Sequence, residues 1–259
     1  MTKLAANLTF MFTEVDFLDR FKAAAAAGFT GVEYLFPYDY EAGVIKQKLA
    51  ENRLTQALHN LPGGNWGAGD RGIGCLPDRV DEFKAGVDTA IKYATALGCT
   101  QINCLAGIKP AGVSDAAAHD TLVANLKYAA PRLKAAGIKL LLEAINTRDI
   151  PGFFVSHTLQ ALEILDAVGS DNVFLQYDIY HMQVMEGDLA LTMERHLKRI
   201  AHIQLADLPG RHEPGTGEIH YPFLFGFLER VGYSGWIGCE YKPAQSTEAG
   251  LGWAKPYLT

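Results

Sequence analysis

The sequence is poor in cysteine and has no disulfide framework that can be read from its spacing. It has four cysteines, Cys75, Cys99, Cys104 and Cys239, and no C-x-x-C pair. Cys104 and Cys239 lie within apolar, strand-like runs. We therefore expect free, buried thiols in a reducing compartment.

The sequence also lacks a cluster of basic residues and a long apolar run. The formal net charge is −6 and the pI is about 5.7, which argues against a nucleic-acid partner. No apolar stretch approaches the ~20 residues of a membrane span. The segment Met1–Asn7 is too polar for a signal peptide. We therefore expect a cytoplasmic protein with no membrane partner.

What the chain does have is a regular alternation of strand-like and helix-like segments. Its 259 residues are 49% hydrophobic and 20% charged, and no linker or shift in composition divides them. Strand and helix patterns alternate eight times, which predicts one (β/α)8 TIM barrel over residues 1–259. A doubly wound open sheet is the alternative, but the G-x-G-x-x-G fingerprint of its dinucleotide-binding form is absent.

Several strand-like runs end in a side chain that carries oxygen. The clearest is Lys139–Asn146, where three consecutive leucines lead directly into Glu143. Such a run is typical of a strand buried on both faces. Because the active site of a (β/α)8 barrel lies at the carboxyl ends of its strands, we expect one rim to carry Glu33, His59, Glu143, Asp178, Gln204 and Glu240.

Three of these side chains predict a metal site. Glu143, Asp178 and Glu240 would repel one another at a partly apolar rim and raise each other's pKa, and a divalent cation removes that conflict. A set of oxygen ligands that includes Gln204 favours Mg²⁺ or Mn²⁺ over zinc. Glu33 and His59, taken alone, are better interpreted as structural residues at strand ends.

Local signals predict some helix boundaries and one long loop. Thr13 and Asp16 have the spacing of a capping box, and Ser114 is placed to cap a long helix that Pro131 should bend or restart. Gly98 should end the helix Val80–Leu97. The five glycines of Leu61–Gly72 predict an irregular loop of the kind that often binds ligands.

The chain resembles the hydroxypyruvate isomerase family, one of the xylose-isomerase-like barrels that also include the tagatose epimerases. The resemblance covers nearly the whole length. Its carriers are Ala6-Asn7-Leu8, Phe36-Pro37-Tyr38, Leu58-His59-Asn60-Leu61-Pro62-Gly63, Gln176-Tyr177-Asp178-Ile179-Tyr180-His181, His212-Glu213-Pro214-Gly215-Thr216-Gly217-Glu218-Ile219 and Gly235-Trp236-Ile237-Gly238-Cys239-Glu240-Tyr241-Lys242-Pro243.

The resemblance implies a metal-assisted isomerase of hydroxypyruvate and tartronate semialdehyde that works through an enediolate. The implied metal ligands are Glu143, Asp178, Gln204 and Glu240, and the implied acid and base are Glu143 and Glu240. Epimerase relatives have histidine where this chain has Gln204, and the change favours Mg²⁺ or Mn²⁺. No organic cofactor is implied.

The substrate-binding residues that we expect come from the ends and loops around this rim. His181 follows Asp178 by three residues and can bind a substrate oxygen. A substrate carboxylate needs a cation, which Arg211 or Lys242 can supply. His59 is the weakest of the four candidates, and for each of them a structural or surface role is the alternative.

The sequence leaves other functions open. A relative that isomerises a 2-oxo-tetronate would have the same metal site and a different pocket wall. A DNA-repair endonuclease of the related zinc-dependent barrels is disfavoured by the acidic charge and by the few histidines at strand ends. A non-catalytic sugar or metal binder would have no use for two facing glutamates. The oligomeric state is open, with a homo-oligomer as one alternative.

Overall fold

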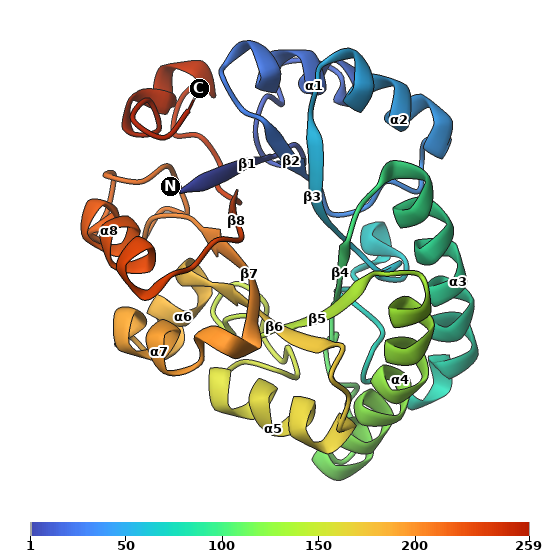
Figure 1. Ribbon diagram of the computed structural model, residues 1–259. Helices are drawn as coiled ribbons and strands as arrows, with labels where there is room; N and C mark the ends of the chain where they lie inside the picture. The colour runs from blue at the N-terminus through green and yellow to red at the C-terminus, as the bar shows by residue number, and fades with distance from the viewer. Residues whose placement is uncertain (1, 259) are drawn as a thin grey trace.

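The computed structural model describes residues 2–258, and its eight strands close into a parallel barrel in chain order. Figure 1 shows the ring of strands with helices around it. The prediction of a (β/α)8 barrel is thereby confirmed. The strands are β1 (Lys3–Asn7), β2 (Gly31–Glu33), β3 (Thr55–Asn60), β4 (Gln101–Cys104), β5 (Lys139–Glu143), β6 (Val173–Asp178), β7 (Ile200–Leu205) and β8 (Trp236–Cys239).

Burial on both faces explains the apolar runs of the strands. Leu140, Leu141 and Leu142 follow one another in β5, and each is fully buried. Successive side chains of a strand point to opposite faces, so one face of β5 packs inside the barrel and the other packs under the helices. The same geometry carries Glu143, the last residue of β5, to the barrel rim.

The outer layer is formed by eight α-helices and four short 3₁₀ helices of the described chain. The α-helices are α1 (Phe17–Ala26), α2 (Ala42–Glu51), α3 (Val80–Leu97), α4 (Asp115–Ala135), α5 (Thr158–Val168), α6 (Ile179–Met185), α7 (Leu189–Arg195) and α8 (Tyr221–Val231). The 3₁₀ helices are η1 (Trp66–Ala68), η2 (Pro77–Arg79), η3 (Leu197–Arg199) and η4 (Glu248–Trp253). As predicted, α3 ends at Gly98, which adopts a left-handed conformation.

Two local predictions were wrong. The capping box at Thr13 does not form, because α1 begins at Phe17 and the Asp16 side chain makes no capping hydrogen bond. The predicted restart of the helix at Pro131 is also wrong, because α4 continues through the proline to Ala135. Buried apolar side chains on both sides of the proline hold α4 against the barrel, among them Leu126 and Leu133.

Helix α6 was not anticipated, and it matters for the site. It starts directly after β6, with Asp178 as its N-cap. The Asp178 Oδ1 atom accepts hydrogen bonds from the backbone N–H groups of Tyr180 at 2.8 Å and His181 at 3.3 Å. The cap leaves the second carboxylate oxygen of Asp178 free for another partner.

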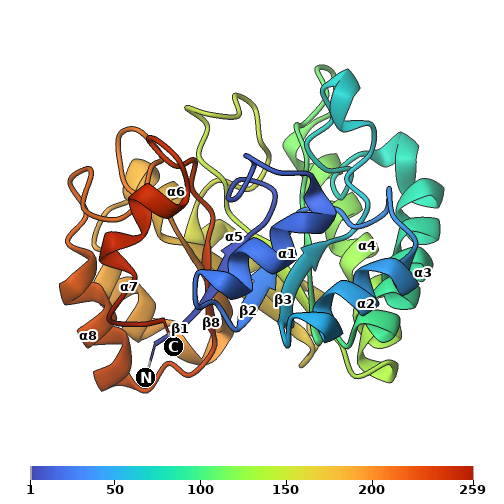
Figure 2. The same ribbon diagram turned by 90° about the horizontal axis from the view of Figure 1, so that it is seen from above.

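The loops that follow the strands rise above the barrel on one side, as Figure 2 shows. The predicted irregular loop Leu61–Gly72 is among them and contains η1. Its Trp66 packs against Phe36, with ring centroids 5.1 Å apart. The four cysteines are buried and unpaired, as expected. Within residues 2–258, no helix is long and apolar enough to cross a membrane.

The N-cap of α4 provides a test of the fold. The Ser114 hydroxyl accepts a hydrogen bond of 3.1 Å from the backbone N–H of Ala117. We expect Ser114→Ala to lower the stability by about 1 kcal/mol, because an N–H of the first turn loses its partner. Denaturant unfolding of both proteins measures this, with Ser114→Thr as the control that keeps a hydroxyl. Equal midpoints for the wild type and Ser114→Ala would contradict the assignment.

Candidate active site

A small cavity of about 70 Å³ lies at the carboxyl ends of the strands. Four of the residues predicted from the sequence line it: Glu143, Glu240, His181 and Arg211. Its other lining residues are Phe10, Leu35, Asn60, Trp66, Leu105, Ile145, Ile150 and Gln176. The cavity therefore combines a largely apolar wall with a few converging polar groups, as ligand sites commonly do.

Three buried side chains in this region can hold a metal ion. Glu143, Asp178 and His181 each offer one ligand atom, and these atoms lie within 4.8 Å of one another. The Asp178 Oδ2 atom is buried and has no hydrogen-bond partner in the described chain. A buried carboxylate oxygen without a donor is costly, and a cation would satisfy it. These residues therefore fit a divalent metal.

Gln204 is the register partner of Asp178 in the neighbouring strand, and both the nitrogen and the oxygen of its side-chain amide are hydrogen-bonded. Its Nε2 atom donates to Glu33 Oε1 at 2.7 Å and to Glu240 Oε2 at 2.8 Å. Its Oε1 atom accepts from Gln176 Nε2 at 2.7 Å. Gln176 was not predicted as a site residue, although it is polar and lies near the end of β6, two positions before Asp178.

The two glutamates each have one oxygen fixed by amide donors. Glu143 Oε2 accepts from Asn103 Nδ2 at 3.0 Å, and Glu240 Oε2 accepts from Asn7 Nδ2 at 3.0 Å. Asn7 lies at the end of β1, and Asn103 lies next to the end of β4. Both are polar residues at or near strand ends, which is the signal that identified the carboxylates, but neither was predicted as a site residue. The amides hold the two carboxylates in place from within the barrel.

Burial and mutual repulsion alter the acidity of this cluster. The pKa of Glu143 is raised well above its ordinary value, mainly by burial and then by Glu240 and Asp178. Burial raises the pKa of Glu240 to about 8, with Arg211 opposing the shift and Asp178 adding to it. Burial also raises the pKa of Asp178 to about 6. Raised carboxyl pKa values of this kind are common at catalytic and metal sites.

Arg211 brings the positive charge of the site. Its Nη2 atom lies 2.7 Å from Glu240 Oε1, and its Nη1 atom lies 3.7 Å from Asp149 Oδ2. Its guanidinium also stacks over the Tyr180 ring, 5.0 Å from the centroid. The buried Arg211 Nε has no hydrogen-bond partner in the described structure. Arg211 therefore places a positive charge in the wall of the cavity.

The loop after β5 orients His181 and Arg211. Asn146 Nδ2 lies 2.6 Å from His181 Nδ1, which leaves His181 Nε2 directed toward Asp178 Oδ2 at 3.6 Å. Burial and the charge of Arg211 lower the pKa of His181 well below its ordinary value, so its imidazole is neutral. Asp149 also accepts from the Tyr180 hydroxyl at 2.9 Å. Asn146 and Asp149 were missed because no residue pattern links this loop to α6.

Three residues that the sequence placed near the rim lie elsewhere. His59 is buried beside Gln56, with 2.9 Å between His59 Nδ1 and Gln56 Nε2, and burial lowers its pKa to about 3. The Lys242 side chain is exposed, although its backbone N–H donates to the Arg211 carbonyl at 2.8 Å. Glu33 lies inside the barrel beneath Gln204. The structure does not bring His59 or Lys242 into the cavity.

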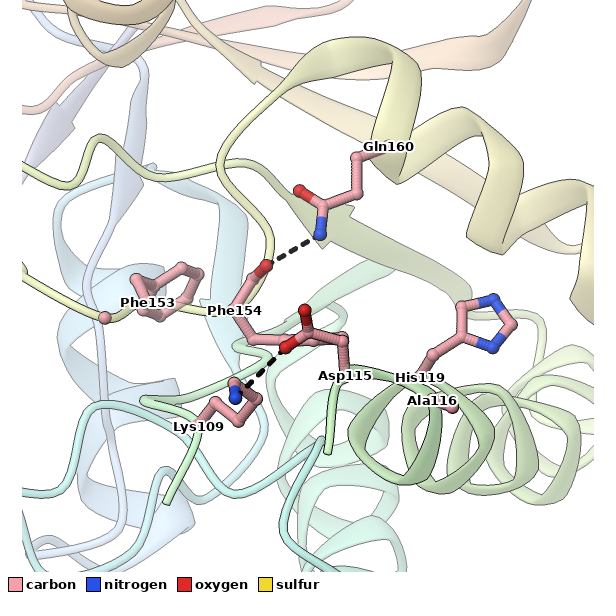
Figure 3. A pocket seen from close by; sticks show the side chains of 8 residues that line it. Lys109, Asp115, Ala116, His119, Phe153, Phe154 and Gln160 are labelled. Atoms are coloured by element: carbon pink, nitrogen blue, oxygen red, sulfur yellow. Dashed lines mark hydrogen bonds and ion pairs between the residues drawn. The ribbon is translucent and has the colours of Figure 1, made fainter. Parts of the chain in front are cut away.

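A second, larger cavity of about 490 Å³ lies on the outer surface, lined by residues of α4, α5 and neighbouring loops. Figure 3 shows Lys109 paired with Asp115 and the Gln160 amide donating to the Phe154 carbonyl. Asp115 is largely exposed, and His119 is partly exposed. This surface cavity contains none of the residues predicted to act in the site.

Comparisons with known proteins show which family and which relatives the chain is similar to. A family model described as xylose isomerase-like TIM barrel matches residues 21–257. A hydroxypyruvate isomerase from Escherichia coli is 55% identical over 99% of this chain and 100% of its own length. A 2-oxo-tetronate isomerase from Pectobacterium atrosepticum is 47% identical over 100% and 98%. A solved structure titled AP endonuclease, family 2, from Brucella melitensis has a TM-score of 0.98 and 47% identity, with both chains covered fully.

The crowded carboxylates lead to a prediction about pH. The unfolded Glu240 side chain should titrate near 4.5, whereas its folded-state pKa is about 8. Below 4.5 the carboxyl is protonated in both states and its contribution to stability is intact. Between the two values the unfolded chain releases a proton that the folded protein keeps, so stability falls as the pH rises. We expect Glu240→Gln to melt at a higher temperature than chelator-treated wild type at pH 8, with a smaller difference at pH 5.

Thermal melts of both proteins at the two pH values test this, in parallel with wild type that has received Mn²⁺. The cation should raise the melting temperature more at pH 8, where it replaces protons that the cluster no longer holds. A difference between wild type and Glu240→Gln that stays the same from pH 5 to pH 8 would contradict the assignment.

Proposed function

The chain belongs to the family of xylose isomerase-like TIM barrels, and from that membership we propose that it is an isomerase of hydroxypyruvate and tartronate semialdehyde. It is an enzyme of the keto-acid isomerase type, as its relatives at 55% and 47% identity indicate. The more closely related of these two carries the name hydroxypyruvate isomerase and matches along its whole length. This relationship supports the three-carbon keto acid as substrate.

The observation that carries the proposal is the placement of Glu143 and Glu240. They lie at the ends of β5 and β8, three strands apart in the ring of eight, and both line one small cavity. A substrate between them meets a carboxyl group on each side. Moving one proton between adjacent carbons needs one group to remove it and one to return it, which this pair can provide.

We propose that Mg²⁺ or Mn²⁺ is held by Glu143, Asp178, Gln204 and Glu240. Oxygen ligands suit these hard cations, and the unpartnered Asp178 Oδ2 atom supports a ligand role. The neutral His181 lies at the edge of this set. When bound, the cation would act as a Lewis acid that stabilises negative charge on the substrate oxygens.

The protein groups then carry the proton transfer. In one direction, an ionised glutamate takes a proton from the hydroxymethyl carbon of hydroxypyruvate, and the substrate becomes an enediolate. The other glutamate, protonated, returns a proton to the neighbouring carbon. The hydroxyl proton moves to the former carbonyl oxygen, which becomes the new hydroxyl, and the former hydroxyl oxygen becomes the aldehyde. The raised pKa of Glu143 and Glu240 suits groups that must both accept and donate.

Arg211 is the proposed partner of the substrate carboxylate. Its guanidinium lies in the cavity wall and carries the positive charge of the site. Charge-assisted hydrogen bonds between arginine and carboxylate are among the stronger interactions of this kind. His181 is placed to contact a substrate oxygen through Nε2, because Asn146 holds its other ring nitrogen.

The cavity is small, about 70 Å³, and Phe10, Trp66 and Ile150 form part of its wall. This size supports the three-carbon substrate of the proposal over the longer 2-oxo-tetronate. A nucleic-acid hydrolase is a weaker candidate, because the net charge is −6 and the possible ligand group contains one histidine.

Substrate and metal dependence can be tested together. We expect the purified enzyme to isomerise hydroxypyruvate with a higher kcat/KM than 2-oxo-tetronates, to lose activity after chelation and to recover it with Mg²⁺ or Mn²⁺. Full activity in protein shown by elemental analysis to be metal-free would contradict the metal site. A preference for the four-carbon acid would move the assignment to 2-oxo-tetronate isomerase.

The two glutamates can be separated from simple ligands by Glu143→Gln and Glu240→Gln. Each change keeps size and an oxygen but removes the base, so we expect turnover to fall by roughly 10²–10⁴ while metal binding persists. Incubation in D₂O with substrate measures deuterium incorporation, and elemental analysis measures metal occupancy. Near wild-type isomerisation by both metal-loaded variants would refute the mechanism.

A further inference from the structure

We propose that Glu33 is a positioning residue for the metal site, which fixes the side-chain amide of Gln204 and, with it, the carboxylate of Glu240. This inference rests on the proposed function, since it assigns Gln204 and Glu240 a role as ligands. Glu33 ends β2 and is fully buried inside the barrel. It does not line the cavity, and donors from Asn7, Gln204 and His202 occupy both of its oxygens, so it acts through its neighbours.

Three hydrogen-bond donors from two strands, β1 and β7, converge on the Glu33 carboxylate. Its Oε1 atom accepts from Asn7 Nδ2 at 2.9 Å and from Gln204 Nε2 at 2.7 Å. Its Oε2 atom lies 2.6 Å from His202 Nε2. On the far side of that ring, Gln101 Nε2 lies 3.0 Å from His202 Nδ1. The Gln101 amide donates to Nδ1, so Nε2 carries the hydrogen that points to Glu33.

This arrangement decides which way the Gln204 amide faces. Its NH₂ group bridges Glu33 Oε1 and Glu240 Oε2, with one hydrogen for each carboxylate. A flipped amide would set its oxygen against both carboxylate oxygens, which repel it. The Gln204 oxygen is therefore kept on the opposite side, where Gln176 donates to it. The proposed ligand role of Gln204 requires a fixed amide orientation, because only the amide oxygen can bind the cation.

The side-chain amide of Asn7, in β1, also bridges the carboxylates of Glu33 and Glu240. Its NH₂ group donates to Glu33 at 2.9 Å and to Glu240 at 3.0 Å. Two amides therefore connect one carboxylate that does not reach the cavity to one that does. Metal ligands are commonly oriented by such outer hydrogen bonds, whose loss costs about 10–100-fold in metal affinity or activity.

The absence of a side chain at Gly238 leaves space for the Glu33 carboxylate. Gly238 lies in β8 opposite the Glu33 carboxylate, and a Cβ at this position would overlap both carboxylate oxygens. Gly238 does not have a positive φ, so the backbone conformation alone does not require glycine there. The space beside Gly238 is occupied by the Glu33 carboxyl group, consistent with a dedicated site for it.

The test is to measure Mn²⁺ binding to chelator-treated protein by calorimetry, without any assay of turnover. In Glu33→Gln an NH₂ group would replace one carboxylate oxygen and would face either the His202 N–H or the amide donors of Asn7 and Gln204. We expect the Kd for Mn²⁺ to rise about 10–100-fold. Glu213→Gln is the matched control, because Glu213 is also buried and accepts a hydrogen bond, from the Ala244 N–H at 2.9 Å, but contacts no proposed ligand. Its Kd should stay within about twofold of wild type.

A double-mutant cycle shows whether Glu33 acts through Gln204. Gln204→Leu alone should weaken Mn²⁺ binding, and adding Glu33→Gln should then cost less than it does in wild type. Glu33→Asp provides a second variant that keeps the buried charge, should the glutamine variant not fold, and its shorter side chain should also raise the Kd. Far-UV circular dichroism and thermal melts confirm that each variant is folded.

The outcomes separate this inference from the function on which it rests. Wild type that binds no Mn²⁺ would overturn the proposed metal site and this inference with it. Wild type that binds Mn²⁺, with folded Glu33→Gln and Glu33→Asp binding it equally tightly, would overturn the positioning role alone. Fully additive effects of Glu33→Gln and Gln204→Leu would also overturn it.

Discussion

The repulsion among buried carboxylates at one end of the barrel is the constraint on which the site depends. Glu143, Asp178 and Glu240 are brought together where water is largely excluded, and burial raises the pKa of each. Charges of one sign in such a place need a compensating cation or a proton. Arg211 supplies part of that compensation, and the unpartnered Asp178 Oδ2 indicates where a metal would supply the rest.

A layer of amides beneath the carboxylates prevents this repulsion from pushing them apart. Asn103 holds one oxygen of Glu143, and Asn7 and Gln204 hold one oxygen of Glu240. Amides can perform this task because they donate two hydrogen bonds without adding charge. Glu33 anchors two of them from a deeper layer. The barrel interior is thus partly polar, and its polar groups serve the orientation of the rim.

The strands and the loops of the barrel contribute different residues to the site, which explains how one barrel can accept related substrates. The strands carry the carboxylates and the amides, whereas the loops carry Arg211, Trp66 and Ile150, which line the cavity. The relatives named hydroxypyruvate isomerase and 2-oxo-tetronate isomerase match the chain over nearly its whole length. Substrate choice in such a set is expected to depend on the loop side chains, because the proposed metal ligands and proton-transfer groups all lie at strand ends.

The sequence by itself determined the barrel and the set of carboxylates at its rim. An apolar run such as Leu140–Leu142 has to be a strand buried on both faces, and the residue after it has to lie at the strand end. Polar residues at successive strand ends could therefore be collected without coordinates. That argument works because strand direction and side-chain alternation are local properties of the chain.

Only the tertiary structure decided what each rim residue contacts. Glu33 and His59 looked alike from the sequence, yet Glu33 lies under Gln204 while His59 packs beside Gln56. Asn146 and Asp149 meet His181 and Arg211 across separate loops, and no periodic pattern links them. Hydrogen-bond partners such as Asn7 and Glu240 are 233 residues apart along the chain, so their distance follows from the closure of the barrel.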